Sequence, residues 1–244
     1  DMTQWVGKRY WLVGASEGLG RALAHRMSRA GVELVLSARS GDRLNALADE
    51  LPGPCRVVTC DVSDDADVAR AAAEAGEIDG LVYLAGVYWP QPAQAWQADQ
   101  VTAMFDINLT GAARVLGQVV PQMTGRDSGH IVLTGSLSGF RGLPGATGYA
   151  ASKAGVMAMA EALHADLRRS GVLVQLVNPG FIRTRLTDKN DFRMPFLMEP
   201  DEAAQVIFDH MNTDRFQKSF PAPFSWLFRL SRFLPGPIYD RLFA

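Results

Sequence analysis

Short apolar runs alternate with longer helical patterns between residue 9 and about residue 177, and this alternation restricts the fold more than any other feature. The apolar runs predict strands at residues 9–13, 33–37, 55–59, 79–84, 129–135 and 172–177. Their hydrophobicity is continuous along each run, as expected when helices cover both faces of a parallel sheet. The intervening patterns predict helices at residues 18–30, 41–50, 64–75, 99–124 and 148–170. Such strand–helix–strand units predict a doubly wound α/β sheet, with residues 1–244 forming one domain.

The composition is ordinary for a soluble globular protein, with 48% hydrophobic residues, 20% charged residues and a formal net charge of −2. Lys and Arg are scattered without a basic run, so no nucleic-acid partner is predicted. Cys55 and Cys60 would point to opposite faces of one strand, which disfavours a disulfide. No signal peptide precedes the first predicted strand, and we therefore expect a cytoplasmic protein.

A glycine-rich turn follows the first predicted strand and leads into the first predicted helix. Glycines let the backbone approach a pyrophosphate, and the start of a helix offers it unpaired amides. The spacing is G-x-x-x-G-x-G, and its place between strand and helix favours dinucleotide binding over a plain tight connection. The predicted cofactor contacts in this turn are Gly14, Ser16, Glu17, Gly18, Leu19 and Gly20.

The end of the second predicted strand indicates which cofactor is preferred. A carboxylate at this place would accept the adenosine ribose hydroxyls and repel a 2′-phosphate, but the chain has Ala38 there. Arg39 and Ser40 follow, and a guanidinium beside a hydroxyl suits a phosphate. We therefore expect NADPH to be preferred over NADH. Glu17 favours NADH mildly, and a solvated Arg39 on the surface is the alternative.

A serine, a tyrosine and a lysine form the candidate catalytic group. Tyr149 and Lys153 stand four residues apart, with Ser136 thirteen residues before Tyr149. On a helix this offset places phenol and ammonium on one face, where the cation would lower the tyrosine pKa. Ser136 would hydrogen-bond a carbonyl or hydroxyl group. The three residues predict an oxidoreductase, although a Tyr–Lys pair by itself can also be an ordinary helix surface.

With these residues and the glycine turn, the sequence resembles the short-chain dehydrogenase/reductase family from residue 9 to about residue 187. The resemblance implies a Rossmann-like domain, hydride transfer between a nicotinamide and a carbonyl or secondary alcohol, and Asn108 as a fourth catalytic residue. Tyr149 would transfer the proton, Lys153 would bind the nicotinamide ribose, and Asn108 would hold a water linking Lys153 to solvent. The further cofactor contacts that it implies are Asp61, Val62, Ala85, Gly86, Pro179, Gly180, Ile182 and Thr184.

The sequence departs from the family pattern at the first and fourth predicted strands. Tyr83 and Leu84 replace two asparagines of the family motif, and Val13 replaces the usual threonine before Gly14. These departures put in doubt a hydrogen bond that ties the fourth strand to its neighbours.

Two segments bear on the substrate and on partners. Residues 181–200 are predicted to form a substrate lid, and residues 220–244 an apolar C-terminal tail. The tail is expected to pack on the body or on a partner subunit of a homodimer or homotetramer, or to dock on a membrane as an amphipathic helix. Adaptable apolar side chains favour a hydrophobic ketone or aldehyde over a sugar, although core packing explains them as well. These side chains are Tyr88, Trp89, Phe140, Leu143, Met194, Phe196 and Met198.

Other functional classes remain as alternatives to an NADPH-dependent reductase. They are a non-catalytic NADP(H)-sensing protein, an NAD-dependent alcohol dehydrogenase, and an epimerase or dehydratase that retains its cofactor. No G-x-S-x-G turn of a serine hydrolase occurs in the sequence. No metal site is predicted, because metal-ligand spacing is lacking among His25, His130, His164 and His210.

Overall fold

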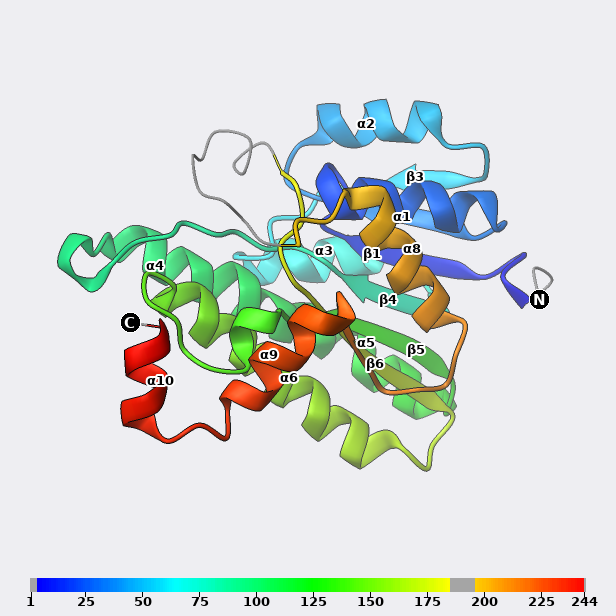
Figure 1. Ribbon diagram of the computed structural model, residues 1–244. Helices are drawn as coiled ribbons and strands as arrows, with labels where there is room; N and C mark the ends of the chain where they lie inside the picture. Colours follow the sequence, from blue (N-terminus) through cyan, green and yellow to red (C-terminus); the bar gives the residue numbers. More distant parts are fainter. Residues whose placement is uncertain (1–3, 185–195, 244) are drawn as a thin grey trace.

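The fold is built on one parallel sheet with helices on both faces (Figure 1). The computed structural model describes residues 4–184 and 196–243. Its sheet has seven strands in the order β3-β2-β1-β4-β5-β6-β7, and every neighbouring pair is parallel. The strands are β1 Arg9–Val13, β2 Glu33–Ser37, β3 Cys55–Val57, β4 Gly80–Tyr83, β5 Gly129–Thr134, β6 Val172–Pro179 and β7 Gln217–Phe220.

Helices α1, α2 and α8 cover one face of the sheet, and α3, α5 and α6 cover the other. Successive side chains of each strand point to opposite faces of the sheet, so that Leu12 packs in the core on the first face and Trp11 in the core on the second. Figure 1 shows α8 alongside α1. The helices are α1 Gly18–Arg29, α2 Gly41–Glu50, α3 Asp65–Ala75, α4 Ala98–Phe105, α5 Gly111–Arg126, α6 Thr147–Leu167, α8 Pro200–Met211, α9 Ala222–Ser231 and α10 Gly236–Phe243.

The doubly wound sheet confirms the predicted fold class, with differences in detail. No helix was predicted at α8, Pro200–Met211. The prediction missed β7, because Gln217–Phe220 is a short, mostly polar edge strand without an apolar run. The single helix expected at 99–124 is interrupted: α4 leads into a π-helical turn at Asp106–Thr110, and α5 follows. Widened turns of this kind often accompany functional sites.

The strand order reverses beside β1, which pairs with β2 on one side and β4 on the other. Ligands of open α/β sheets bind outside the carboxyl ends of the strands at such a switch point. The glycine turn follows β1 directly, so the fold brings it to this edge of the sheet.

The segment predicted as a lid is described only at its two ends. Ile182 and Met198 form a parallel bridge, and Arg183 N donates to Met198 O at 2.9 Å. Residues 185–195, including the predicted substrate contact Met194, lie outside the described residues. In the described parts of the chain, no helix has the length and apolar character needed to cross a membrane.

Candidate active site

Three candidate catalytic side chains meet near the carboxyl end of β5. Ser136 follows β5 and begins the short 3₁₀ turn Leu137–Gly139, where its Oγ accepts from Ser138 N at 3.1 Å. Tyr149 and Lys153 come from the first turns of α6. Lys153 is buried against the sheet, and its Nζ donates to Thr134 O at 3.1 Å. The predicted grouping of hydroxyl, phenol and ammonium is thus formed by one strand end and one helix.

The protonation of Tyr149 differs from the expectation. Burial raises the pKa of the Tyr149 phenol above its ordinary value, and the nearby Tyr88 raises it further, although a hydrogen bond with Ser136 lowers it in part. Lys153 does not offset the burial, because its Nζ bonds Thr134 O and lies 5.8 Å from the centre of the Tyr149 ring. Burial also lowers the pKa of Lys153 itself, to about 8. In this structure Tyr149 is therefore a protonated phenol at neutral pH.

An aromatic side chain that the sequence placed only among substrate contacts lies against the phenol. The ring of Tyr88 packs on that of Tyr149 with 4.3 Å between centroids and 37° between planes. Tyr88 belongs to the loop after β4, and burial raises its own pKa. The loop thus forms an aromatic wall over the candidate proton donor.

Asn108 lies in the π-helical turn and clamps the same loop. Its Oδ1 accepts from Val87 N at 2.8 Å, while its Nδ2 donates to Val87 O at 3.0 Å and to Ser152 Oγ at 3.1 Å. A Cβ built on Gly86 would stand 3.3 Å from Asn108 Oδ1 and 3.5 Å from Lys153 Nζ. The predicted residues Asn108, Lys153 and Gly86 therefore converge, and the direct role of Asn108 here is to fix the loop after β4.

Tyr83, one of the departures from the family pattern, ties β4 to another part of the fold by a side-chain hydrogen bond. The buried Tyr83 hydroxyl donates to Ile107 O at 2.7 Å and so ties β4 to the π-helical turn. Leu84 N donates to Val13 O at 2.8 Å, which holds β4 against β1. Gly111 leaves room for the phenol, since a Cβ there would lie 2.7 Å from the Tyr83 oxygen. Side-chain and backbone hydrogen bonds therefore join the end of β4 to the π-helical turn and to β1.

The glycine turn is packed too closely for larger residues. Gly14 has φ +95°, and a Cβ there would lie 2.4 Å from Ala85 N. A Cβ on Gly20 would lie 1.9 Å from Gly14 O. Helix α1 begins at Gly18 after Glu17, whose side chain makes no capping hydrogen bond. Ser16, Gly18 and Leu19 thus surround a helix start whose first amides point to the carboxyl edge of the sheet.

The residues predicted at the adenosine end gather beyond β2. Arg39 is exposed, and Ser40 caps α2 by accepting from Arg43 N at 3.4 Å. Arg43, which sequence reasoning missed, forms an ion pair with Glu17 at 3.1 Å. Its position four residues after Arg39, on the first turn of a predicted helix, could have indicated a second cation at this site. Arg39, Ser40 and Arg43 form a cationic end of the site, beside a carboxylate that Arg43 neutralises.

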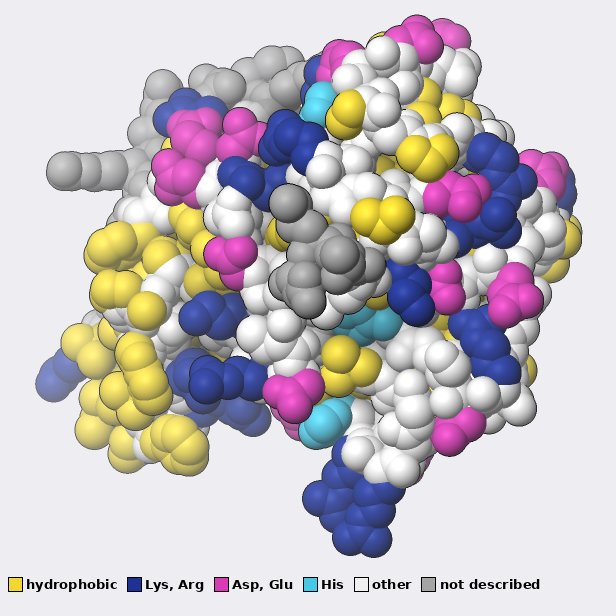
Figure 2. Space-filling model, turned by 90° about the vertical axis from the view of Figure 1, so that its right-hand side faces the viewer, with side chains coloured by type: hydrophobic (Ala, Val, Ile, Leu, Met, Phe, Trp, Pro, Cys, Tyr) yellow, Lys and Arg dark blue, Asp and Glu magenta, His cyan; other side chains and the backbone are white. Residues whose placement is uncertain are grey.

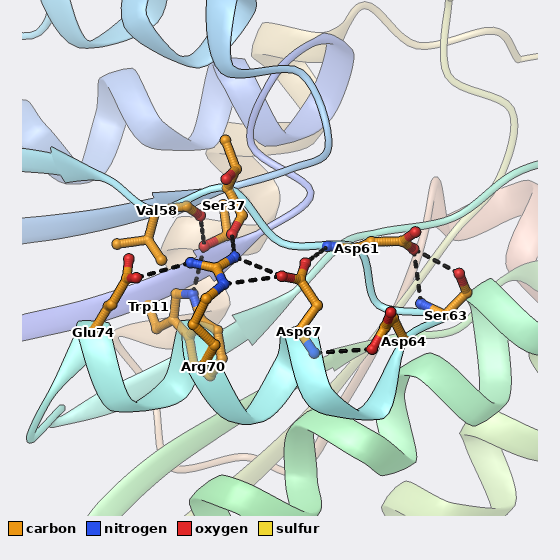
Figure 3. Close-up of polar contacts among 10 residues, drawn as sticks. Trp11, Ser37, Val58, Asp61, Ser63, Asp64, Asp67, Arg70 and Glu74 are labelled. Atoms are coloured by element: carbon orange, nitrogen blue, oxygen red, sulfur yellow. Dashed lines mark hydrogen bonds and ion pairs between the residues drawn. The ribbon is translucent and has the colours of Figure 1, made fainter.

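Hydrogen bonds with residues of α3 hold the backbone of Asp61 in place (Figure 3). Asp61 N donates to Asp67 Oδ2 at 2.6 Å, and Arg70 Nε donates to the other oxygen of Asp67 at 2.9 Å. The Asp61 carboxylate accepts from the Ser63 hydroxyl at 2.6 Å and from Ser63 N at 3.0 Å. These hydrogen bonds, with a smaller contribution from the charge of Arg39, lower the pKa of Asp61. The carboxylate is thereby ionised and fixed in place.

The remaining predicted cofactor contacts border the same edge of the sheet. Val62 is buried, and its carbonyl accepts from Arg114 at 2.9 Å. Pro179 ends β6, and Gly180 N donates to Phe220 O of β7 at 2.8 Å. Ile182 packs on the core below α1 and α8, while Thr184 is exposed at the last described position before the gap.

Comparison with known proteins identifies the family. A model of the short chain dehydrogenase family matches residues 8–193. The chain belongs to the short-chain dehydrogenase family. An uncharacterized oxidoreductase of Myxococcus xanthus is 39% identical over 236 residues, which cover 94% of this chain and 93% of the relative. The family implies binding of NAD(P), and the protein is an oxidoreductase of this family.

Solved structures give the same fold for this short-chain dehydrogenase. A short chain dehydrogenase/reductase family protein superposes with a TM-score of 0.80 at 26% identity, covering 88% of this chain and 96% of the other. A short-chain dehydrogenase from Streptomyces avermitilis superposes with a TM-score of 0.83 at 24% identity, covering 96% and 95%.

The residues of this dehydrogenase fit a nicotinamide dinucleotide. A Cβ on Gly18 would meet nothing within 4 Å, so the turn is open at this glycine, and the start of α1 that follows suits a pyrophosphate. Within the described ranges, two buried side-chain oxygens at the carboxyl ends of β5 and β6 have no hydrogen-bond partner, Thr134 Oγ1 and Asn178 Oδ1. Unused polar atoms at this edge are suited to a polar ligand.

Sequence reasoning did not foresee the tertiary roles of two residues in this dehydrogenase. Tyr83 was noted only as a departure, and Ser152, next to Lys153, received no role although its hydroxyl accepts from Asn108. Neither position carries a motif that would indicate its partner, which lies across the fold. Among the residues that the structure describes, no three His, Cys, Asp or Glu side chains gather to hold a metal ion.

Proposed function

We propose that the protein is an NADPH-dependent reductase of hydrophobic ketones or aldehydes, which also catalyses the reverse oxidation of secondary alcohols. The observation that carries the proposal is the convergence of Ser136, Tyr149 and Lys153 beside the glycine turn of a short-chain dehydrogenase. The arrangement offers a hydrogen-bond donor, a proton donor and a cation within one site.

Each side chain has a distinct role in the proposed reaction. The bound nicotinamide supplies or takes up the hydride. The Ser136 hydroxyl holds the carbonyl oxygen of the substrate, and the Tyr149 phenol gives that oxygen its proton. Burial keeps Tyr149 protonated, which is the form that reduction needs. The Lys153 ammonium binds the ribose hydroxyls and stabilises the phenolate left after proton transfer.

The adenosine end supports NADPH over NADH. Arg39 and Arg43 bring two guanidinium groups close to the start of α2, and Ala38 provides no carboxylate to repel a 2′-phosphate. Glu17 was the residue that favoured NADH, and its ion pair with Arg43 reduces that repulsion. Replacing Arg39 by Ala should raise the KM for NADPH about tenfold and leave that for NADH nearly unchanged. Equal effects on both cofactors would contradict the preference.

The walls of the site support an apolar substrate. The Tyr88 ring covers Tyr149. Ile182 and Met198 form the bridge that joins the two described ends of the 181–200 segment. Phe140 was also predicted as a substrate contact, but it lines a hollow of about 200 Å³ with Arg229, Arg232 and Phe233. Tyr88 and the described ends of the segment are therefore the better substrate contacts.

A spectrophotometric assay tests the proposal. Oxidation of NADPH and of NADH is followed with ketones and aldehydes of increasing apolar size. Tyr149→Phe should lower kcat by about 10²–10⁴-fold and leave cofactor affinity nearly intact. Tyr239→Phe, a tyrosine on α10 away from the catalytic group, serves as the control. Unchanged turnover in Tyr149→Phe would remove the assigned proton donor.

The alternative of a non-catalytic NADP(H) sensor predicts a different result. A sensor requires the glycine turn and Arg39, but it does not require Ser136, Tyr149 and Lys153 together. Tight cofactor binding without turnover of any carbonyl, and with no change on Tyr149→Phe, would favour the sensor. An epimerase or dehydratase would be recognised by a cofactor that is bound and unchanged after turnover.

A further inference from the structure

Helix α9 has apolar side chains on its outer face as well as on its inner face, where Phe224 is buried. Ser225 and Ser231 are buried at 2% and 5% exposure, and their hydroxyls donate to Ala222 O and Phe228 O in the preceding turn of the same helix. Trp226 and Leu230 are 55% and 59% exposed. A surface helix normally has a polar outer face, so the exposed apolar side chains of α9 depart from the usual pattern.

The exposed apolar side chains continue beyond α9. Phe233 is 83% exposed, and α10 adds Ile238 at 49% and Leu242 at 64%. Figure 2 shows hydrophobic side chains gathered at the lower left of the molecule, with Lys or Arg side chains beside them. We call this surface the tail face and define it as Trp226, Leu227, Leu230, Phe233, Ile238 and Leu242. A contiguous apolar surface of this kind marks an interaction site.

The tail face is held rigidly on the body. The Arg141 guanidinium donates to Ser231 O and, at 2.8 Å, to Leu234 O, and it lies 3.9 Å from the centre of the Tyr239 ring. The Tyr239 hydroxyl donates to Gly142 O. These contacts fix α9 and α10 with their apolar side chains outward, so the exposure belongs to the folded state.

Charge indicates what covers this face. Residues 221–244 contain three arginines and the single acidic residue Asp240, a formal side-chain charge of +2 in a chain whose net charge is −2. Arg229, Arg232 and Arg241 are all exposed, and Arg229 lies 4.7 Å from the centre of the Trp226 ring. Tryptophan and arginine around an apolar helix face suit the boundary of an anionic bilayer. A second copy on the same face would bring like-charged rims together.

We propose that the tail face docks the protein on the surface of an anionic lipid membrane. Helix α9 has 10 residues and is about 15 Å long, too short for a hydrocarbon core of about 30 Å, so it lies along the interface. The apolar side chains enter the headgroup boundary, and the arginines contact lipid phosphates. The proposal does not depend on the proposed redox activity.

The inner side of α9 contacts the two described ends of the 181–200 segment. Phe224, on the inner side of α9, packs on Phe181 at 5.8 Å and on Phe196 at 5.3 Å between ring centroids. Both residues belong to the 181–200 segment at the carboxyl edge of the sheet.

Vesicle sedimentation of the full chain tests the proposal, with phosphatidylcholine vesicles compared with vesicles that also contain phosphatidylglycerol. The wild-type protein should sediment with the anionic vesicles and much less with the neutral ones. The double variant Leu230→Asp/Phe233→Asp should weaken binding about a hundredfold. The matched control is Val6→Asp, at a 67% exposed apolar position outside the tail face, and should bind as the wild type does. Arg229→Gln and Arg232→Gln should each weaken binding about fivefold on anionic vesicles only.

Three results would overturn the proposal. They are no sedimentation with either vesicle, equal loss in Val6→Asp, and a dimer in ultracentrifugation that Leu230→Asp/Phe233→Asp dissociates. The last result would assign the tail face to a second copy of the chain. Circular dichroism and thermal melting establish that each variant is folded, independently of any enzyme activity.

Discussion

Lys153 carries its ammonium in a position that is only 6% exposed, with Thr134 O as a hydrogen-bond acceptor. Burial disfavours the charged form, which is why its pKa falls from 10.5 to about 8. The residue is therefore charged at neutral pH but close to titration. The same burial raises the pKa of its neighbour Tyr149, so the pKa values of the two groups move apart and the pair is an ammonium and a protonated phenol at neutral pH.

The Lys153 shift predicts a loss of NADPH affinity as the pH rises through about 8, because the ribose hydroxyls lose a cationic donor. Fluorescence titration of NADPH on either side of this pH measures the effect. Lys153→Met should bind weakly at both values. Between about 8 and 10.5 the unfolded chain binds more protons at this residue, so Lys153 makes the folded state more stable as the pH rises there. A pH-independent affinity in the wild type would contradict the role of the ammonium.

Tyr88 is the second residue whose effect can be measured directly. Its ring, 4.3 Å from that of Tyr149, excludes water from the phenol. Tyr88→Ala should raise the KM for large apolar carbonyls about tenfold, change that for small ones less, and lower the phenol pKa. Tyr88→Phe keeps the ring and should resemble the wild type. Steady-state kinetics over a range of pH distinguish these outcomes, and equal KM changes for all substrates would exclude a contact with the apolar part.

At the scale of elements, the π-helical turn at Asp106–Thr110 joins the loop after β4 to the catalytic helix. Asn108 bonds Val87 on the loop and Ser152 on α6, and Tyr83 bonds Ile107 from below. A widened turn exposes its carbonyls to such side-chain donors. The loop, the turn and the helix are thus positioned together.

Tyr83→Phe should destabilise the fold by about 1–3 kcal/mol, because the partly buried Ile107 carbonyl loses its donor. Urea unfolding measures the loss. Tyr88→Phe, at a partly buried tyrosine of the neighbouring loop, is the comparison and should change stability by less. A Tyr83→Phe protein as stable as the wild type would show that another donor or water replaces the phenol.

The glycine turn makes a sharper prediction at the same scale. Gly14→Ala places a Cβ 2.4 Å from Ala85 N at a φ of +95°, so β1 and the loop after β4 must separate. We expect a lower melting temperature and a loss of NADPH binding of at least about tenfold. Gly142→Ala, where a Cβ meets nothing within 4 Å, should leave both nearly unchanged. Similar behaviour of the two variants would contradict the close approach.

At the scale of the whole molecule, a buried network of hydrogen bonds connects Tyr10 near the start of the sequence with His210 on α8. Tyr10 Oη and His130 Nδ1 are 2.7 Å apart, as are His130 Nε2 and Gln175 Oε1, while Gln175 Nε2 donates to His210 O at 3.0 Å. Because the amide oxygen of Gln175 can only accept, His130 Nε2 carries the hydrogen and Nδ1 accepts from Tyr10. This hydrogen-bond network links β1, β5, β6 and the end of α8 through a neutral histidine.

The network around His130 predicts that the fold loses stability in acid. Burial lowers the pKa of His130 from 6.5 to about 4. The unfolded chain therefore binds more protons between these values, and stability is lost as the pH falls from 6.5 toward 4. The loss should amount to about 3 kcal/mol. Urea unfolding across this range should give a shallower slope for His130→Gln than for the wild type, and His210→Gln should remove a smaller part. Identical slopes would assign the acid sensitivity to other groups.

Local pattern and spacing allowed much of the fold to be predicted. Six of the seven strands have continuous apolar runs, and α2 begins and ends at the predicted residues, because periodicity and capping residues act over a few positions. The glycine turn after β1 and the spacing of Ser136, Tyr149 and Lys153 led to the family for the same reason. The edge strand β7 lacked such a signal, since its pairing with β6 depends on a neighbour about 40 residues away.

The sequence by itself determined the layers of the fold, the family and the set of reacting groups, because each depends on residue types at short, regular spacing. Only the tertiary structure decided that Lys153 turns toward Thr134, that Tyr83 bonds the Ile107 carbonyl, and that Tyr88 covers the phenol. It also decided that α9 exposes Trp226, Leu227 and Leu230 while it buries Phe224. These features depend on burial and on partners brought together from distant segments, which no local pattern specifies.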